Sequence, residues 1–407
     1  MIEIIKKSNL DYFKVYIFFY IMIIPWDLFN SMKSILSGVL LIWWITIGKK
    51  NDYFSNFKDI FYNKPILIFI IFYMYMYLSL LWSDNYSWAF KELKLYTYWI
   101  LIVPILFSVL KREDIRKIFI SLTFSFGLYS LYSILVFIGL IKMPEVNGHI
   151  NYATVTVYVA FNTILSFYLF FSMSKESRFK YIFLIISIVS FFAILIQNGR
   201  IGQISFFGTL FVLMIYYRKY LFEYKRILAS FVLIIIFAIL FLNYLGKTDR
   251  YIKGYSELVS SIETKEFNGS WGPRAYMWYV AMDTIPKNIL FGSGIGDTRD
   301  KIIKFNEQTT YKLQHHLIGY HNQHLDYIAS LGILGYGLFL ASILVLLRNL
   351  YEENKEMLLI GLAFFSIVII DGFGDVIIAF KPFTNVYAII FVLLAIATKK
   401  PSKRSSY

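Results

Sequence analysis

The chain has 407 residues, of which 58% are hydrophobic, 20% are aromatic and only 16% are charged, a composition typical of a protein whose main solvent is lipid. Its net charge is +14, but the basic residues are scattered between apolar runs without a basic–aromatic recognition motif, which argues against binding to nucleic acid. The sequence contains no cysteine, which excludes disulfides, a thiolate metal site and a cysteine nucleophile.

Apolar runs predict about twelve transmembrane helices, so the expected fold class is an all-α integral membrane protein. In chain order the runs cover residues 12–27, 33–48, 65–82, 94–110, 117–140, 152–173, 180–197, 201–217, 227–245, 323–347, 356–371 and 384–398. Several runs are shorter than the roughly 20 residues that span a bilayer. The pairs that meet near 27–33 and 197–201 are therefore predicted as tight hairpins or as partly re-entrant segments.

The distribution of basic residues predicts the orientation of these helices. One alternate set of connections carries 23 Lys and Arg, whereas the other carries only six when one long loop is left out. Because cytoplasmic loops are enriched in Lys and Arg, we expect both termini in the cytoplasm and the long loop outside. The predicted organisation is nine transmembrane helices in 1–245, a large outer loop in 246–322, and three further helices with a cytoplasmic tail in 323–407.

Arg200 stands almost alone between two apolar runs, Tyr181–Ile196 and Ile201–Tyr216. An arginine next to hydrocarbon is unfavourable, and it usually marks a functional site or a buried partner. The alternative is a side chain that reaches the phosphate groups of ordinary membrane lipids.

The outer loop contains one predicted amphipathic helix, Pro273–Ile285, because proline suits the first helical position and Pro286 closes the segment. Arg274 lies in its first turn, where the helix dipole disfavours a cation by roughly 0.3–1 kcal/mol. A bound anion offsets this term, since helix-start N–H groups and a planar guanidinium both bind phosphate oxygens. A surface salt bridge is the alternative.

The stretch Gly292–Gly296 lacks the context of a nucleotide site, and we expect a flexible turn there.

Four of the five histidines fall within ten positions, immediately before the run at 323–347: His315, His316, His321 and His324. Histidine titrates near neutrality, so a cluster at a membrane edge is a candidate for proton transfer. His321, at the junction of loop and helix, is the candidate general base or donor to a departing group; the alternative is a histidine that caps the helix. The spacing fits no standard zinc pattern, and no metal site is predicted.

Residues beside His321 have candidate supporting roles. Asn322 is the predicted cap of the helix, with Asp326 favourably placed in the first turn. His324 is expected on the same helical face as His321, where it either orients His321 or packs.

Charged residues in two other outer connections complete the candidates. Lys91 and Lys94 precede the fourth helix, where they add positive charge to a carrier site or are simply solvated. Asp371 and Asp375 lie in the last outer connection, where they bind an acceptor or pair with the arginines.

The order of residues around His321 resembles the O-antigen ligase family of Gram-negative bacteria. His321-Asn322 is followed by nine residues and then by Gly332-Ile333-Leu334-Gly335, at the start of a late transmembrane helix. Asn198-Gly199-Arg200-Ile201-Gly202 is similar to the family's arginine loop, although Gly199 stands where the family usually has serine. Arg274, followed by Pro286 and the glycines at 292–296, is similar to its arginine-then-glycine pattern.

This resemblance implies a C-type glycosyltransferase-like fold in the bacterial inner membrane, with the active site facing the periplasm. It implies a metal-independent, inverting transfer of O-antigen polysaccharide from undecaprenyl pyrophosphate to lipid A–core oligosaccharide, without a cofactor. Arg200 and Arg274 are then the residues that hold the pyrophosphate, and His321 activates the acceptor hydroxyl or orders the site. The candidates for substrate binding are Asn322, His324, Lys91, Lys94 and Asp371.

Two alternatives remain open on the sequence. An O-antigen polymerase, whose acceptor is a second carrier-linked glycan, is the alternative within the family. A secondary transporter of lipid or sugar is the alternative from a different class. It is disfavoured because the chain shows no half-to-half repeat and its unusual charges gather at the outer membrane edge.

Overall fold

The computed structural model describes residues 11–28, 31–174, 176–219, 225–308 and 319–399, and every regular element in these ranges is a helix, which confirms the all-α class. The first half contains α2 (Tyr12–Ile23), η1 (Ile24–Trp26), α3 (Met32–Gly48), α4 (Tyr53–Phe57), η2 (Lys58–Tyr62), α5 (Lys64–Leu78), η3 (Ser79–Trp82), α6 (Tyr86–Tyr96), α7 (Trp99–Val109), η4 (Arg112–Asp114), α8 (Ile115–Phe137) and α9 (Tyr152–Ser172). The second half contains α10 (Lys180–Ile196), α11 (Arg200–Tyr216), α13 (Lys225–Tyr244), α14 (Thr248–Glu263), α15 (Gly272–Thr284), η5 (Ile285–Asn288), α16 (Thr298–Gln308), α17 (Gln323–Glu353), α18 (Lys355–Asp371), η6 (Ile377–Ala379) and α19 (Phe383–Ala397).

Each of the twelve apolar runs coincides with a helix, but not every helix is long enough to cross a membrane alone. Among the described residues, five helices meet the length and composition needed, or up to seven if two bent pairs each count as one span. One bent pair joins α3 to α4 and η2 at 112°, and the other joins α13 to α14 at 88°. The chain is therefore a multi-pass membrane protein, whereas the number of twelve spans stays a prediction.

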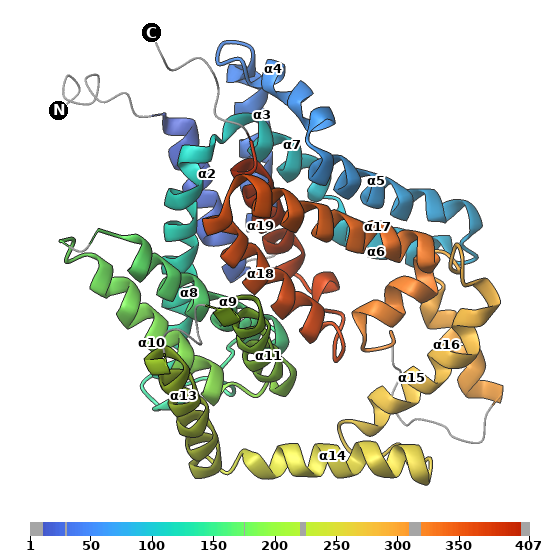
Figure 1. Cartoon of the computed structure of the whole chain (residues 1–407). Coiled ribbons are helices and arrows are strands. Elements are labelled where there is room, and N and C mark those ends of the chain that lie inside the picture. The colour runs from blue at the N-terminus through green and yellow to red at the C-terminus, as the bar shows by residue number, and fades with distance from the viewer. Residues whose placement is uncertain (1–10, 29–30, 175, 220–224, 309–318, 400–407) are drawn as a thin grey trace.

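The centre of the bundle is α19, in which every residue from Phe383 to Ala397 is buried. A helix that is apolar all round is normally surrounded by other helices. Figure 1 shows α19 in the middle of the molecule, where α5, α7 and α17 pack against it. A second group is organised around α9, which contacts α8, α10, α11 and α18.

The helix α17 is broken at Gly332, whose φ of 69° is not helical. The N–H groups of Ile333 and Leu334 donate instead to carbonyls of the segment 289–294, at 2.8 and 3.2 Å, and two N–H groups of that segment donate back to α17. A Cβ at Gly332 would lie 2.2 Å from the carbonyl oxygen of Leu290, so glycine is required. The glycine-rich segment is a turn, as expected, and residues 292–297 are buried and packed against the break.

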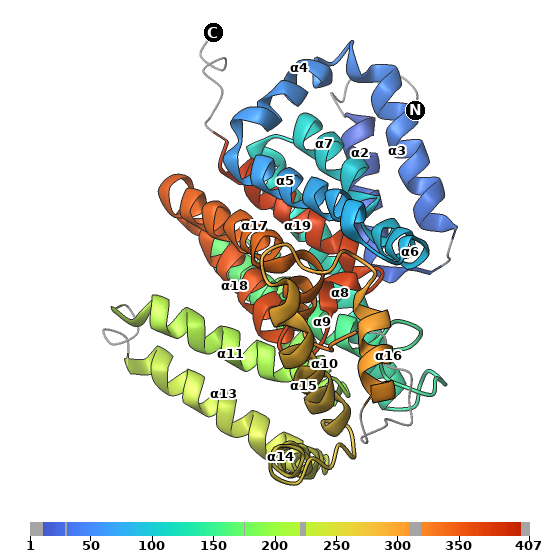
Figure 2. The ribbon, with the colours of Figure 1, turned by 90° about the vertical axis from the view of Figure 1, so that its right-hand side faces the viewer.

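The region predicted as a loop, 246–322, contains three α-helices rather than one. The helix α14 lies across the end of α13 in Figure 1, and Figure 2 views it nearly end-on. The helix α15 begins at Gly272 and includes Pro273 in its first turn, which confirms that a helix starts here as predicted. It packs on α14, α16 and α17, and its side chains form a small core with Tyr320.

Candidate functional site

Arg200 is the first residue of α11, and the start of this helix packs closely on α9. A Cβ at Gly199 or Gly202 would lie 2.4 or 2.5 Å from the side chain of Thr156 in α9, so both glycines permit the close approach. No side chain caps this end of α11, and the N–H groups of its first turn have no intrahelical acceptors. The sequence Gly-Arg-Ile-Gly thus presents Arg200 beside a helix N-terminus that favours anions.

The turn before Arg200 is fixed by Lys247, which follows α13. Its ammonium donates to the carbonyl oxygens of Ile196 at 2.5 Å and Gln197 at 2.8 Å, where α10 ends. Burial and the nearby Arg250 lower the pKa of Lys247 to about 8. The position of Arg200 therefore depends on contacts from both neighbouring helices, α9 and α13.

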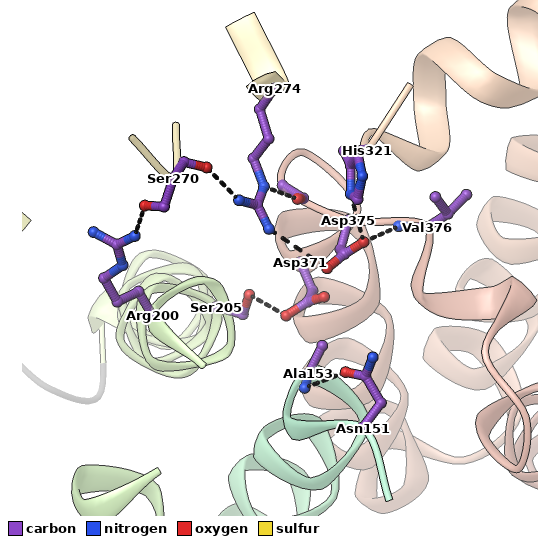
Figure 3. Close-up of polar contacts among 11 residues, drawn as sticks. Asn151, Ala153, Arg200, Ser205, Ser270, Arg274, His321, Asp371, Asp375 and Val376 are labelled. Carbon is purple, nitrogen blue, oxygen red and sulfur yellow. Dashed lines mark hydrogen bonds and ion pairs between the residues drawn. The ribbon is translucent and has the colours of Figure 1, made fainter. Parts of the chain in front are cut away.

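Arg274 lies in the first turn of α15, as predicted, and its guanidinium joins α15 to the connection after α18. Its Nε donates to the carbonyl oxygen of Gly374 at 2.9 Å, and Nη1 donates to that of Ser270 at 2.7 Å. Its Nη2 lies 3.8 Å from Oδ2 of Asp375, and the two side chains are only 16% and 8% exposed. Figure 3 shows Arg274 between Ser270 and Asp375.

Ser270 connects the two arginines, since its carbonyl accepts from Arg274 and its hydroxyl accepts from Arg200. The ring centroid of Trp271 lies 6.0 Å from Cζ of Arg200 and 5.7 Å from Cζ of Arg274. Glu257 in α14 fixes this turn, because its Oε2 accepts from the N–H groups of Ser270 at 2.9 Å and Trp271 at 3.0 Å. The structure therefore brings the two predicted arginines together.

A cavity of about 410 Å³ opens beside these groups. Its lining includes the guanidinium groups of Arg200, Arg250 and Arg274, the start of α11, and the carboxylates of Glu145 and Asp375. Three cations against two carboxylates favour an anionic ligand. Arg200 donates to the carbonyl oxygen of Arg250 and to the hydroxyl of Ser270, and Arg274 donates to two carbonyl oxygens, so each guanidinium uses two of its five N–H groups and keeps donors for such a ligand.

His321 lies just before α17, with a φ of 46°, and it contacts the opposite side of Asp375. Its Nδ1 is 3.4 Å from Oδ1 of Asp375, whereas the other oxygen of this carboxylate faces Arg274. The side chain of His321 is 33% exposed, so a substrate has access to the ring while the carboxylate is held inside. His321 is not itself among the residues that line the cavity, and Asp375 links it to the pair of arginines.

Tyr320, next to His321, is a weak competitor as a base. Burial raises the pKa of Tyr320 to about 12, and its hydroxyl lies 2.7 Å from Oγ1 of Thr284. The phenol therefore stays protonated near pH 7, and the imidazole is the better proton acceptor at this position.

Asn322 caps α17, as predicted. Its side-chain oxygen accepts from the N–H groups of His324 at 3.0 Å and Leu325 at 3.1 Å. The cap sets where the helix starts, and therefore leaves His321 outside it. Asn322 is not among the residues that line the cavity.

The expectation that His324 shares a helical face with His321 is wrong, because α17 begins only at Gln323. His324 is buried, with Nε2 at 2.9 Å from the carbonyl oxygen of Ile369 and Nδ1 at 2.9 Å from the hydroxyl of Tyr336. The contact with Ile369 holds α17 against α18, and the contact with Tyr336 lies within α17, across its break at Gly332. His324 is therefore a packing residue in this structure.

The other candidates lie away from the cavity lining. Lys91 and Lys94 are exposed on α6, and Nζ of Lys91 lies 4.2 Å from the ring centroid of Trp88. Asp371 is fully buried at the end of α18, with Oδ2 at 3.4 Å from the hydroxyl of Ser205. His315 and His316 fall outside the described residues. In the part of the chain that the structure describes, no three His, Asp or Glu side chains are grouped to hold a metal ion.

Sequence reasoning missed four residues of the site: Arg250, Glu257, Ser270 and Trp271. Arg250 and Glu257 lie on one face of α14, a segment that was read as loop. The repeat of apolar residues at helical spacing in 248–263 was the available signal. Ser270 and Trp271 act through contacts with distant residues, for which the local sequence holds no signal.

Comparison with known proteins gives two findings. Residues 182–340 match the family described as O-antigen ligase, and this match spans Arg200, Arg274 and His321. An uncharacterized protein of Haemophilus influenzae is 24% identical over 352 residues, which cover 84% of this chain and 83% of that protein. The matched region runs from α10 into α17 and contains most of the cavity.

Proposed function

We propose, from the match of residues 182–340 to the O-antigen ligase family, that this chain is a membrane glycosyltransferase of that kind, acting on a lipid-linked glycan. The donor is a polysaccharide on undecaprenyl pyrophosphate, and the acceptor is the lipid A–core oligosaccharide at the periplasmic face. The observation that carries the proposal is the cavity at which Arg200, Arg250 and Arg274 meet.

In the proposed complex the donor pyrophosphate occupies this cavity. A guanidinium offers two parallel N–H donors to phosphate oxygens, and the start of α11 adds backbone N–H groups. Negative charge grows on the departing phosphate oxygen as the bond to the sugar breaks, and fixed donors stabilise this charge most in the transition state. Because the arginines supply this stabilisation, the proposed transfer does not require a metal ion.

His321 acts on the acceptor side of the cavity. Asp375 orients the ring through Nδ1, so Nε2 is left to accept the proton of the attacking hydroxyl. The acceptor oxygen forms its bond to the anomeric carbon while the bond from that carbon to the pyrophosphate breaks. Attack opposite the leaving group inverts the anomeric configuration, and undecaprenyl pyrophosphate is released.

Reconstitution in proteoliposomes tests the proposal against its nearest alternative, an O-antigen polymerase. Carrier-linked glycan is supplied with either lipid A–core or a second carrier-linked glycan as acceptor. We expect glycosylated lipid A–core in the first case and no chain growth in the second. Growth on the carrier-linked acceptor alone assigns a polymerase, and no transfer to either acceptor by folded protein contradicts the proposal.

A further inference from the structure

The helix α14 has three distinct faces. Residues at spacings of four, three and four form an apolar stripe: Tyr251, Tyr255, Leu258 and Ile262. The same spacing forms a stripe that faces the candidate site: Arg250, Gly254, Glu257 and Ser261. The third face is polar and includes Asp249, Lys253, Ser256, Ser260 and Glu263. Such a helix suits the boundary between an apolar and an aqueous phase.

The first residue of the apolar stripe shows which way the stripe faces. Tyr251 packs on a cluster formed by Leu195, Ala238 and Leu242, which belong to the apolar helices α10 and α13. The apolar stripe therefore faces the side of α14 on which these membrane helices lie. Because α13 and α14 meet at 88°, the rest of α14 extends sideways beyond the bundle (Figure 1).

Beyond Tyr251 most of the apolar stripe is exposed, and only Leu258 is half-buried. Tyr255 and Ile262 are each 71% exposed, and Ile252, at the margin of the stripe, is 69% exposed. The lipid-facing surface of α13 is similarly uncovered, with Leu233 at 65% and Leu240 at 63% exposure. The exposed part of the stripe therefore continues an apolar surface that belongs to a membrane-embedded helix.

We propose that α14 lies flat in the interface of the bilayer leaflet at which α13 ends, with its apolar stripe inserted among the lipids. An interfacial helix of this kind buries its apolar face about 5–10 Å into the boundary between headgroups and acyl chains. The five charged residues of α14, two basic and three acidic, nearly cancel. The partner is thus the apolar part of the leaflet, and binding needs no anionic headgroup.

This placement has a consequence for the candidate site. Glu257, on the site-facing stripe, holds the N–H groups of Ser270 and Trp271, and a Cβ at Gly254 would lie 2.8 Å from Nη1 of Arg200. The depth of α14 in the leaflet therefore sets the depth of the arginine-lined cavity. The inference concerns the membrane and does not depend on the proposed reaction.

Single-cysteine variants test the proposal, because the native chain has no thiol. Tyr255→Cys and Ile262→Cys report on the apolar stripe, and the matched controls Ser256→Cys and Glu263→Cys report on the polar face one residue away. Each full-length variant is labelled with an environment-sensitive fluorophore and reconstituted in phosphatidylcholine vesicles with or without brominated acyl chains.

We expect blue-shifted emission at 255 and 262, quenched several-fold more strongly by brominated lipid than emission at 256 and 263. Addition of anionic lipid should leave this pattern unchanged. Equal quenching at all four positions overturns the proposal. Blue-shifted emission at 255 without quenching also overturns it, since a second copy of the chain would then cover the stripe.

Discussion

Asp375 joins the two halves of the candidate site. Its oxygens face different partners, Arg274 at 3.8 Å and His321 at 3.4 Å, and the N–H of Val376 donates to it at 3.1 Å. Groups that share one buried carboxylate respond to each other's charge. In the proposed reaction, charge on the leaving pyrophosphate beside Arg274 and proton transfer at His321 are therefore coupled through this residue.

Replacement of His321 should remove the proton acceptor while the fold is kept. His321→Asn is the preferred variant, because asparagine tolerates the positive φ of this position. We expect turnover in the reconstituted assay to fall by about 10²–10⁴-fold, as for loss of a general base.

His324→Ala is the matched control, three residues away. It deletes buried contacts to Ile369 and Tyr336, so about 1–3 kcal/mol of stability should be lost while most of the turnover remains. Thermal unfolding in detergent separates the two effects. Near wild-type turnover of His321→Asn would remove His321 from the reaction.

The pair of arginines should depend on shape as well as charge. Arg200→Lys and Arg274→Lys keep the cations but lose the planar fork, so both variants should bind carrier lipid more weakly and turn over more slowly. Because both residues bind one leaving group in the proposed reaction, the double variant should be less damaging than the product of the two single effects.

Arg299→Lys provides the control for this series. Cζ of Arg299 also lies near a tryptophan ring, 4.5 Å from the centroid of Trp88, but Arg299 does not line the cavity. It should leave turnover unchanged. Full activity of both cavity variants would refute the proposal that the two arginines bind the pyrophosphate. Strictly multiplicative effects would assign the arginines to separate sites.

At the scale of elements, the break in α17 explains the glycines after His321-Asn322. Gly332 adopts a φ of 69° so that segment 289–294 can hydrogen-bond to the helix, and a Cβ at Gly335 would lie 2.8 Å from the ring of Tyr75. The glycine spacing therefore serves the packing of α17. The proposed chemistry belongs to His321, before the helix.

Gly332→Ala should consequently destabilise the protein without a direct effect on the reaction. A side chain at this φ adds strain of about 1–3 kcal/mol, and its contact with Leu290 adds more. Gly337→Ala, in the same helix, meets no atom within 4 Å and should be neutral or slightly stabilising. Thermal unfolding of both variants in detergent decides this, and equal melting temperatures would contradict the packing role.

Sequence patterns predicted those helices and caps that depend on interactions between residues close together in the chain. The apolar runs became helices, Pro273 marked the start of α15, and Asn322 capped α17. Arg200 and Arg274 were found because each is unfavourable where it stands, which is a local signal too.

The remainder depends on contacts between distant segments. The break in α17 is completed by segment 289–294, and the two arginines meet through Ser270, which lies just before α15 but 70 residues from Arg200. The sequence wrongly predicts that His324 and His321 share a helical face, because α17 begins two residues after His321. The contacts that bring the site residues together are tertiary contacts. The periodicity of the sequence gives no indication of them.

At the scale of the molecule, the site combines the start of α11, the start of α17 and the end of α18 at one end of the bundle (Figure 2). The opposite ends of the same helices carry Arg218, Lys219, Arg348 and Lys355. Basic residues favour the cytoplasmic side, so the site is predicted to face the periplasm.

Met282→Cys on α15 and Lys50→Cys after α3 test this orientation, since both positions are exposed. An impermeant thiol reagent should label position 282 in intact spheroplasts, and position 50 only after permeabilisation; the reverse pattern would place the arginines and His321 in the cytoplasm.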